Sequence, residues 1–161
     1  MIPLNKKEVK KIYEAIKSQW DAEVRLDYVF LLSEKNKLYI INKEITKIDL
    51  SRLRINTFGM YFGEYSKGNL RLSIEGSQII GKYAKKNVLM IDNENTKKWL
   101  RGEELSLNTD SEGFAVIKNK NDFLGCGRII NNTQNFSFRE KFCSKKILNY
   151  VPKNRRVRIS D

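Results

Sequence analysis

Apolar residues recur at helical spacing near the N-terminus of the chain: Val9, Ile12, Tyr13, Ile16 and Trp20. Asn5 and Glu8 have the spacing of a helix N-cap and its N3 partner, so the pattern predicts a capped helix that buries one face. The lysines of this segment fall mostly on the opposite face, where we expect contact with solvent.

Residues rich in β-branched and aromatic side chains come next. The runs DYVFLL (27–32) and KLYIIN (37–42) are separated by four polar residues, which predicts a hairpin. NTFGMYFGEY (56–65) and NLRLSIE (69–75) predict two further strands, and GSQIIGKYAKK (76–86) predicts a short helix.

The pattern restarts at Asn87. We expect a strand at NVLMI (87–91), then a helix capped by Asp92 or Asn93 that runs to Arg101 and ends at Gly102. GFAVIK (113–118) and FLGCGRII (123–130) predict a second hairpin, and ILNYV (147–151) and RVRI (156–159) predict closing strands. The chain therefore divides into two expected domains, residues 1–86 and 87–161.

Charge narrows the choice of partner. The chain has 31 Lys and Arg against 19 Asp and Glu, a formal net charge of +12. Such a field attracts polyanions, which are nucleic acids or acidic membranes. The basic amphipathic helix at the N-terminus keeps the membrane alternative open, but no apolar run approaches the ~20 residues that a span needs. We expect nucleic acid as the partner, and no membrane.

The chain has no histidine, so triads and histidine-based zinc sites are excluded. Its neighbouring carboxylates have the character of solvated surface positions. We therefore expect no enzyme activity, no catalytic residue, no cofactor and no metal. The two cysteines, Cys126 and Cys143, lack CxxC spacing, and no signal peptide is visible, so we expect a cytoplasmic protein. For Cys126 we expect a small buried apolar side chain.

The C-terminal segment concentrates positive charge. Residues 139–161 hold eight Lys and Arg against Glu140 and Asp161. On a strand, Arg156 and Arg158 share one face, while Val157 and Ile159 share the other. Such a strand suits a phosphate track, since guanidinium groups match phosphate oxygens, and it equally suits an edge strand protected by charge from aggregation. The pattern leaves both interpretations open.

The order of elements from NVLMI through ENTKKWLRGEEL to GFAVIKNKNDFLGCGRI resembles a PUA domain, a small β pseudo-barrel. The upstream part, GMYFGEYSKGNLRLSIEGSQIIGKYAKKNV, is similar to the pre-PUA segment of Nip-seven-type ribosome-biogenesis factors. The tail NYVPKNRRVRI looks like the end of the PUA-like RNA-binding domain of Sun-type RNA cytosine methyltransferases. The resemblance implies an α+β protein, an α/β pre-PUA domain followed by a PUA domain.

The resemblance also implies a function. PUA domains bind RNA without catalysis, in ribosome biogenesis or RNA modification, and ribosomal RNA or its precursor is the expected partner of this monomer. The usual RNA-facing surface combines the helix end with the last strand. On this chain the matching residues are Lys98, Arg101, Gly102, Glu103, Arg155, Arg156 and Arg158.

One departure and two alternatives remain. Many PUA domains follow the helix with a Pro-Gly turn, whereas this chain runs from Ser106 to Asp110 without one, which leaves the role of Gly102 open. The aromatic run Phe58, Tyr61, Phe62 and Tyr65 belongs to the core or to an interface, so an adaptor in a pre-ribosomal complex is one alternative. A stand-alone targeting subunit for an RNA methyltransferase is the other. A eukaryotic source would imply a nucleolar location.

Overall fold

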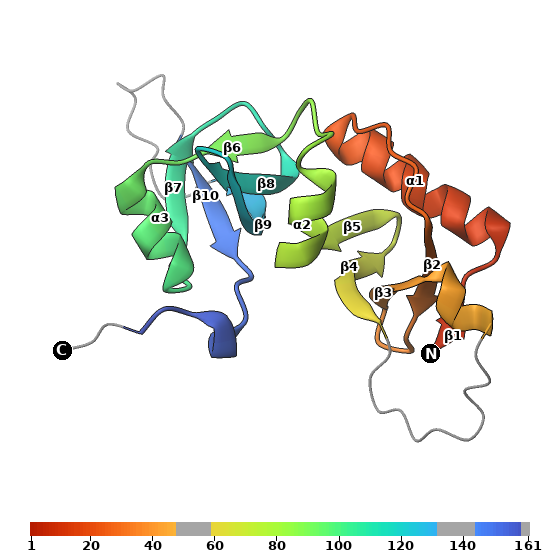
Figure 1. The fold of residues 1–161 in the computed structure, drawn as a ribbon. Coiled ribbons are helices and arrows are strands. Elements are labelled where there is room, and N and C mark those ends of the chain that lie inside the picture. The colour runs from red at the N-terminus through yellow and green to blue at the C-terminus, as the bar shows by residue number, and fades with distance from the viewer. Residues whose placement is uncertain (48–58, 132–143, 159–161) are drawn as a thin grey trace.

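The structure, a computed structural model, describes residues 1–47, 59–131 and 144–158 (Figure 1). Within these residues the strands form two five-stranded sheets. The first sheet is an antiparallel meander of β1 (Ile2–Pro3), β2 (Tyr28–Leu32), β3 (Lys37–Asn42), β4 (Met60–Ser66) and β5 (Asn69–Leu72). The second sheet has the order β6 (Val88–Met90), β8 (Gly113–Asn119), β9 (Asp122–Asn131), β10 (Ser144–Asn149) and β7 (Leu105–Asn108). In this sheet β6 runs parallel to β8 and the other pairs are antiparallel, so the expected α+β class is confirmed.

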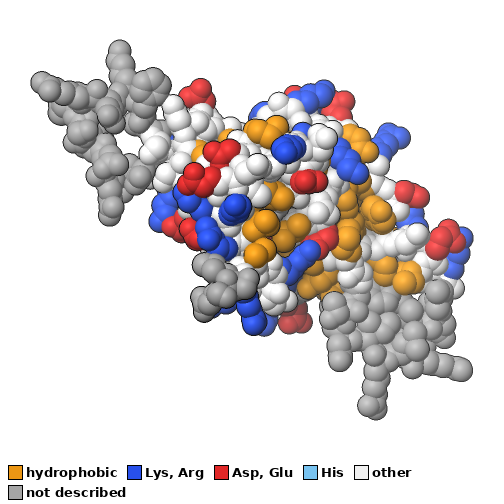
Figure 2. Space-filling view, turned by 60° about the vertical axis from the view of Figure 1, so that its left-hand side comes forward, with side chains coloured by type: hydrophobic (Ala, Val, Ile, Leu, Met, Phe, Trp, Pro, Cys, Tyr) orange, Lys and Arg blue, Asp and Glu red, His pale blue; other side chains and the backbone are white. Residues whose placement is uncertain are grey.

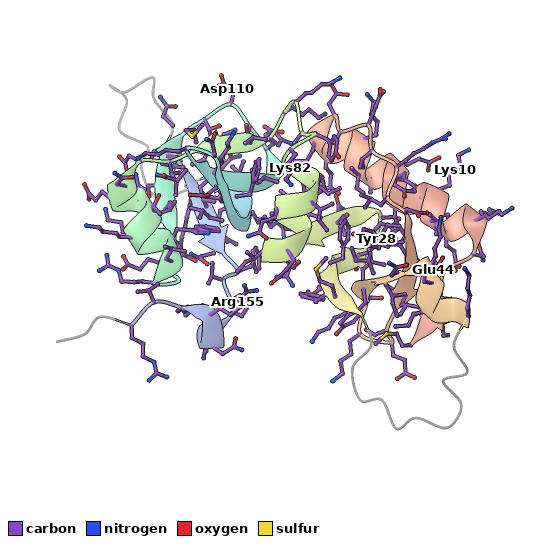
Figure 3. The ribbon with its side chains drawn as sticks, viewed as in Figure 1. Lys10, Tyr28, Glu44, Lys82, Asp110 and Arg155 are labelled. Carbon is purple, nitrogen blue, oxygen red and sulfur yellow. The ribbon has the colours of Figure 1, made fainter. Side chains whose placement is uncertain are left out.

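The N-terminal helix α1 (Lys6–Trp20) begins as the sequence predicts. The Asn5 side chain accepts from the Glu8 N–H (3.0 Å), and the Glu8 carboxylate accepts from the Asn5 N–H (2.8 Å). The helix buries Ile12, Ala15, Ile16 and Trp20 against the first sheet. Its lysines are on the other side, and Figure 3 shows Lys10 directed away from the body of the protein. The predicted amphipathic helix is confirmed.

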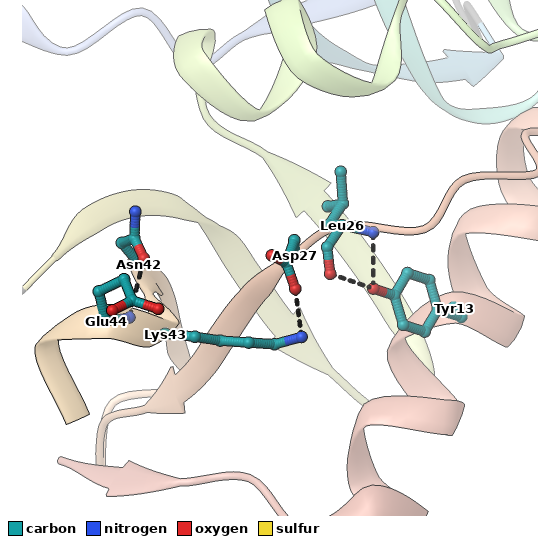
Figure 4. Close-up of polar contacts among 6 residues, drawn as sticks. All are labelled: Tyr13, Leu26, Asp27, Asn42, Lys43 and Glu44. Carbon is teal, nitrogen blue, oxygen red and sulfur yellow. Dashed lines mark hydrogen bonds and ion pairs between the residues drawn. The ribbon is translucent and has the colours of Figure 1, made fainter. Parts of the chain in front are cut away.

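Polar contacts hold the connection between α1 and β2 against α1 and against the turn that follows β3 (Figure 4). The Tyr13 hydroxyl donates to the carbonyl of Leu26 (3.2 Å) and accepts from its N–H (3.1 Å). Lys43, which begins the 3₁₀ turn η1 (Lys43–Lys47), pairs with Asp27. The two Tyr13 contacts satisfy the backbone N–H and carbonyl of Leu26, which lies outside any strand, two residues before β2 begins.

The helix α2 (Ile74–Ile80) begins two residues before the predicted segment and ends well before residue 86. The Ser73 hydroxyl caps it by accepting from the Gly76 N–H (2.9 Å). A Cβ atom at Gly76 would lie 2.2 Å from the carbonyl oxygen of Phe62, so a glycine is required for α2 to approach β4 this closely. No helix in the described parts of the chain is long and apolar enough to cross a membrane.

Strands β8 and β9 are buried on both faces. Along β8, Val116 packs into the core of the first half, whereas Ala115 and Ile117 pack into a second core around Trp99. Along β9, Cys126 belongs to the first core and Ile129 to the second. Because successive side chains of a strand point to opposite faces, this hairpin separates two cores and belongs to both.

The thiol of Cys126 shows how completely this hairpin is covered. It is 3% exposed, and burial raises its pKa to about 12. The expected small buried apolar side chain is confirmed at Cys126, whereas Cys143 lies outside the described residues.

The predicted closing strand RVRI is wrong over its described residues 156–158. The chain forms a 3₁₀ turn, η2 (Lys153–Arg155), and then continues without strand pairing. The place beside β10 is already taken by β7, a strand that the sequence analysis does not predict. With β9 on its other side, β10 offers no free edge to a further strand. Ile159 and the predicted strand residues 56–58 lie outside the described residues.

The sheets divide between α2 and β6, close to the predicted domain boundary. The apolar cores do not divide there, because Val116 and Cys126 from the second sheet pack with Phe62 and Leu72 from the first. Ile74 from α2 packs in turn against the second core. Division into the domains 1–86 and 87–161 therefore stays a prediction.

The shared hairpin predicts that the halves unfold together. Ile117→Ala should lower the free energy of unfolding by about 2–5 kcal/mol, since it leaves a cavity in the second core. Trp20 lies in the first core and Trp99 in the second. The variant Trp99→Phe keeps only Trp20, so its fluorescence reports on the first half. The variant Trp20→Phe keeps only Trp99 and reports on the second half. In urea titrations, Ile117→Ala should lower the midpoint of both fluorescence signals equally. A shift confined to the Trp99 signal would show that the halves unfold independently.

Candidate nucleic-acid interface

The helix α3 (Asn93–Leu100) ends in a Schellman motif, where the sequence predicts its end. The Gly102 N–H donates to the carbonyl of Trp99 (2.9 Å), and the Glu103 N–H donates to that of Lys98 (3.0 Å). Gly102 has φ +86°, a conformation that favours glycine. The Asp92 side chain caps the other end by accepting from the Asn95 N–H (2.8 Å), which decides between the two predicted caps.

The C-terminal tail, residues 150–158, docks on this helix end. Figure 1 shows the chain turning back beneath α3 after β10. The Val157 N–H donates to the carbonyl of Leu100 (2.9 Å), and the Arg156 Nε donates to the carbonyl of Val151 (3.1 Å). A Cβ at Gly102 would lie 2.2 Å from Arg156 Nε, so the Arg156 side chain lies directly against this glycine. The helix end and the tail, which the resemblance places on one surface, are in contact.

Asn149 joins the helix end to the tail and was missed by the sequence analysis. Its side-chain amide donates to the carbonyls of Trp99 (2.8 Å) and Glu103 (2.9 Å). Its side-chain oxygen accepts from the Val151 N–H (2.7 Å). One side chain therefore satisfies a carbonyl at the end of α3, a carbonyl in the turn and a backbone donor two residues after β10. The only sequence signal is an asparagine at the end of an apolar run, which does not reveal partners about 50 residues away.

Three of the predicted cations have acidic partners. Lys98 pairs with Glu94 (2.9 Å), and this contact raises the pKa of the lysine. Arg101 Nε lies 2.9 Å from a Glu103 carboxylate oxygen, an ion pair that lacks hydrogen-bond geometry.

Arg155, which is labelled in Figure 3, pairs with Glu75 at the start of α2. Partial burial opposes ionisation of Glu75, but the backbone N–H of residue 75 and Arg155 together lower its pKa. Exposed pairs of this kind contribute only about 0–1 kcal/mol and are screened by salt, so a phosphate can compete for their cations.

The other cations of this region differ in role. Arg156 is half-buried and holds the tail, whereas Arg158 is exposed. Two lysines that were not predicted, Lys97 on the last turn of α3 and Lys153 in η2, are also exposed. Within the described residues, Lys97, Lys153 and Arg158 make no ion pair. We call these three residues the tail cations. Figure 2 shows Lys and Arg side chains gathered around exposed hydrophobic ones on the face that contains this end of the molecule.

The run Ser106–Asp110, where a Pro-Gly turn was missing, begins with the end of β7. Ser106 pairs with Lys146 and Asn108 with Ser144 across the ladder to β10. The backbone of residues 106–108 is thus committed to the sheet, and the helix end is closed by the Gly102 turn instead.

The two arginines of the tail should differ in their effect on stability. Arg156→Ala removes the hydrogen bond to Val151 and the packing on Gly102, so we expect it to lower the free energy of unfolding by about 1–3 kcal/mol. Arg158→Ala is the matched control and should change it by less than about 0.5 kcal/mol. Chemical denaturation of both variants measures this. Equal effects would contradict the docked tail.

A comparison with protein families finds a match, which covers the part of the chain that contains α3. Residues 86–135 match the family model described as Methyltransferase RsmF PUA domain. The match begins just before β6 and includes α3 and the β8–β9 hairpin. It lies in the C-terminal half, so it bears on the Sun-type resemblance, whereas the Nip-seven resemblance of the first half stays a prediction. No curated protein matches the chain at a significant level. The match also suggests RNA binding, since PUA domains bind RNA. On the basis of this match, the chain contains a PUA domain that is similar to the one of the Sun-type RNA methyltransferase RsmF.

Proposed function

We propose that this protein binds single-stranded RNA through the surface formed by the end of α3 and the docked tail. The observation that carries the proposal is the contact between these two elements within a chain that contains a PUA domain. The tail cations are close in sequence to the residues that make this contact, Leu100 and Gly102 on one side and residues 156–157 on the other. The net charge of +12 supplies the long-range attraction that brings a polyanion to this surface.

The biological setting of the proposal is ribosomal RNA or its precursor, in ribosome biogenesis or RNA modification. The family match favours RNA modification, since the matching family is the PUA domain of a methyltransferase. A second candidate function follows from the same observation: the chain targets an RNA methyltransferase to its substrate. We place the protein in the cytoplasm, or in the nucleolus of a eukaryote, as a monomer.

The adaptor alternative needs the aromatic run at residues 58–65 to form an interface rather than to belong to the core. Of that run, Phe62 is fully buried, Tyr65 packs against the first core, Tyr61 is half-buried beside Tyr39, and Phe58 lies outside the described residues. The aromatic side chains therefore lend it little support. The proposal also assigns no catalytic step to this chain, and turnover of any RNA by the purified protein would overturn that part.

Salt dependence tests the proposed surface. For a labelled single-stranded RNA of mixed sequence, the logarithm of the association constant should fall with the logarithm of the salt concentration. The slope is roughly −0.7 for each phosphate contact, so about five contacts give roughly −3.5. The double variant Lys153→Gln with Arg158→Gln should weaken binding and make the slope less steep by roughly 1.4.

The matched control removes two positive charges from α1. Lys6 and Lys11 are exposed and make no ion pair within the described residues, so Lys6→Gln with Lys11→Gln changes the net charge equally. This control should leave the slope nearly unchanged. A slope near zero for the wild type would refute RNA binding, and a larger loss in the control would move the surface to α1.

A further inference from the structure

A cleft of about 400 Å³ lies between the two halves of the molecule, beside the docked tail. One wall comes from β4, β5 and the start of α2, and the other from β9 and residues 150–155. Its polar and aromatic lining includes Tyr61, Arg71, Glu75, Tyr150, Asn154 and Arg155. This volume falls in the usual range of about 300–1,000 Å³ for sites that take a small ligand, too small for a duplex.

Planar side chains line the cleft, and a row of aromatic rings and guanidinium groups continues away from it. The Arg71 guanidinium lies over the Tyr150 ring, with its carbon 4.3 Å from the ring centroid. The ring centroids of Tyr150 and Phe114 are 6.5 Å apart, and the guanidinium carbon of Arg128 lies 5.9 Å from the centroid of the Phe114 ring. Aromatic rings interleaved with arginines are the usual platform on which proteins stack the bases of single strands.

The charges inside the cleft are balanced. Arg71 pairs with Glu64 (2.6 Å), and Arg155 pairs with Glu75. Of the cations in this region, the tail cations on the outer surface lack such partners within the described residues. The cleft thus suits a neutral planar group, whereas the outer surface suits phosphate. Asn154 is exposed at the rim, and its amide offers both a donor and an acceptor to the edge of such a group.

We infer that the cleft takes one unstacked nucleobase of the RNA strand whose backbone follows the tail cations. The inference rests on the proposed function, because it assumes that the strand binds beside the tail. The base stacks on the Arg71–Tyr150 pair, and the sugar-phosphate backbone stays outside. The cleft between the halves then contributes to reading the strand, in addition to the PUA surface.

An abasic scan tests this directly. A series of single-stranded RNAs, each with one base removed and the backbone kept, is bound to the wild-type protein at low salt. One position, or two adjacent ones, should lose roughly 5- to 150-fold in affinity, the range of a single base–aromatic stack. Tyr150→Ala should weaken binding to the intact RNA and abolish the additional loss at that position. Tyr150→Phe should keep the loss, since the ring remains.

Two further variants keep the test decisive. Tyr28→Ala is the control for Tyr150→Ala, because Tyr28 is 38% exposed on β2, and Figure 3 shows it far from Arg155 on the tail. It should leave the abasic profile unchanged. Asn154→Glu places a carboxylate at the rim of the cleft and leaves the Arg71–Tyr150 pair unchanged. It should reduce the position-specific loss of affinity. This variant keeps the test available if Tyr150→Ala fails to fold.

The outcomes separate the two proposals. An absence of RNA binding at low salt would overturn the proposed function and this inference with it. Binding with equal small losses at every abasic position would overturn the inference alone. A position-specific loss that survives both Tyr150→Ala and Asn154→Glu would also overturn it, since the base would then lie elsewhere.

Discussion

The structure depends on the burial of both faces of the β8–β9 hairpin. One face closes the core that α1 and the first sheet build around Trp20, and the other closes the core around Trp99. Neither half can cover its apolar residues without this hairpin, because Val116 and Ile117 are neighbours that point into different cores. Exposure of either face would cost roughly 1.5–3 kcal/mol for each large side chain returned to water.

The second core positions the proposed RNA surface. Trp99 anchors α3 in the second core, and its ring N–H donates to the carbonyl of Leu124 in β9 (3.0 Å). Asn149 then fixes the end of α3 to the end of β10, and the tail docks on that end through Val157. The tail cations therefore lie on backbone that is held in place by these hydrogen bonds. The cleft lies where the same tail passes the first half of the molecule.

The sequence predicted those elements whose signals are local. The capping box of α1, both hairpins and the end of α3 at Gly102 depend on residues within a few positions of one another, and all are present. The hairpin at residues 113–130 was predicted, but the burial of both its faces was not, because each face is covered by residues remote in sequence. The strand predicted at 156–158 was wrong because alternation alone cannot show that β7 occupies the sheet edge. The partners of Asn149 and Arg155 are equally remote, which is why the pairing of Arg155 with Glu75 could not be foreseen.

The central claim is that RNA lies on the surface formed by the end of α3 and the tail. Photocrosslinking of single-stranded RNA to the wild-type protein, followed by mass spectrometry of the linked peptides, tests it most directly. The account predicts crosslinks within residues 97–103 and 150–158. Crosslinks confined to the lysine face of α1, with none at the tail, would contradict it.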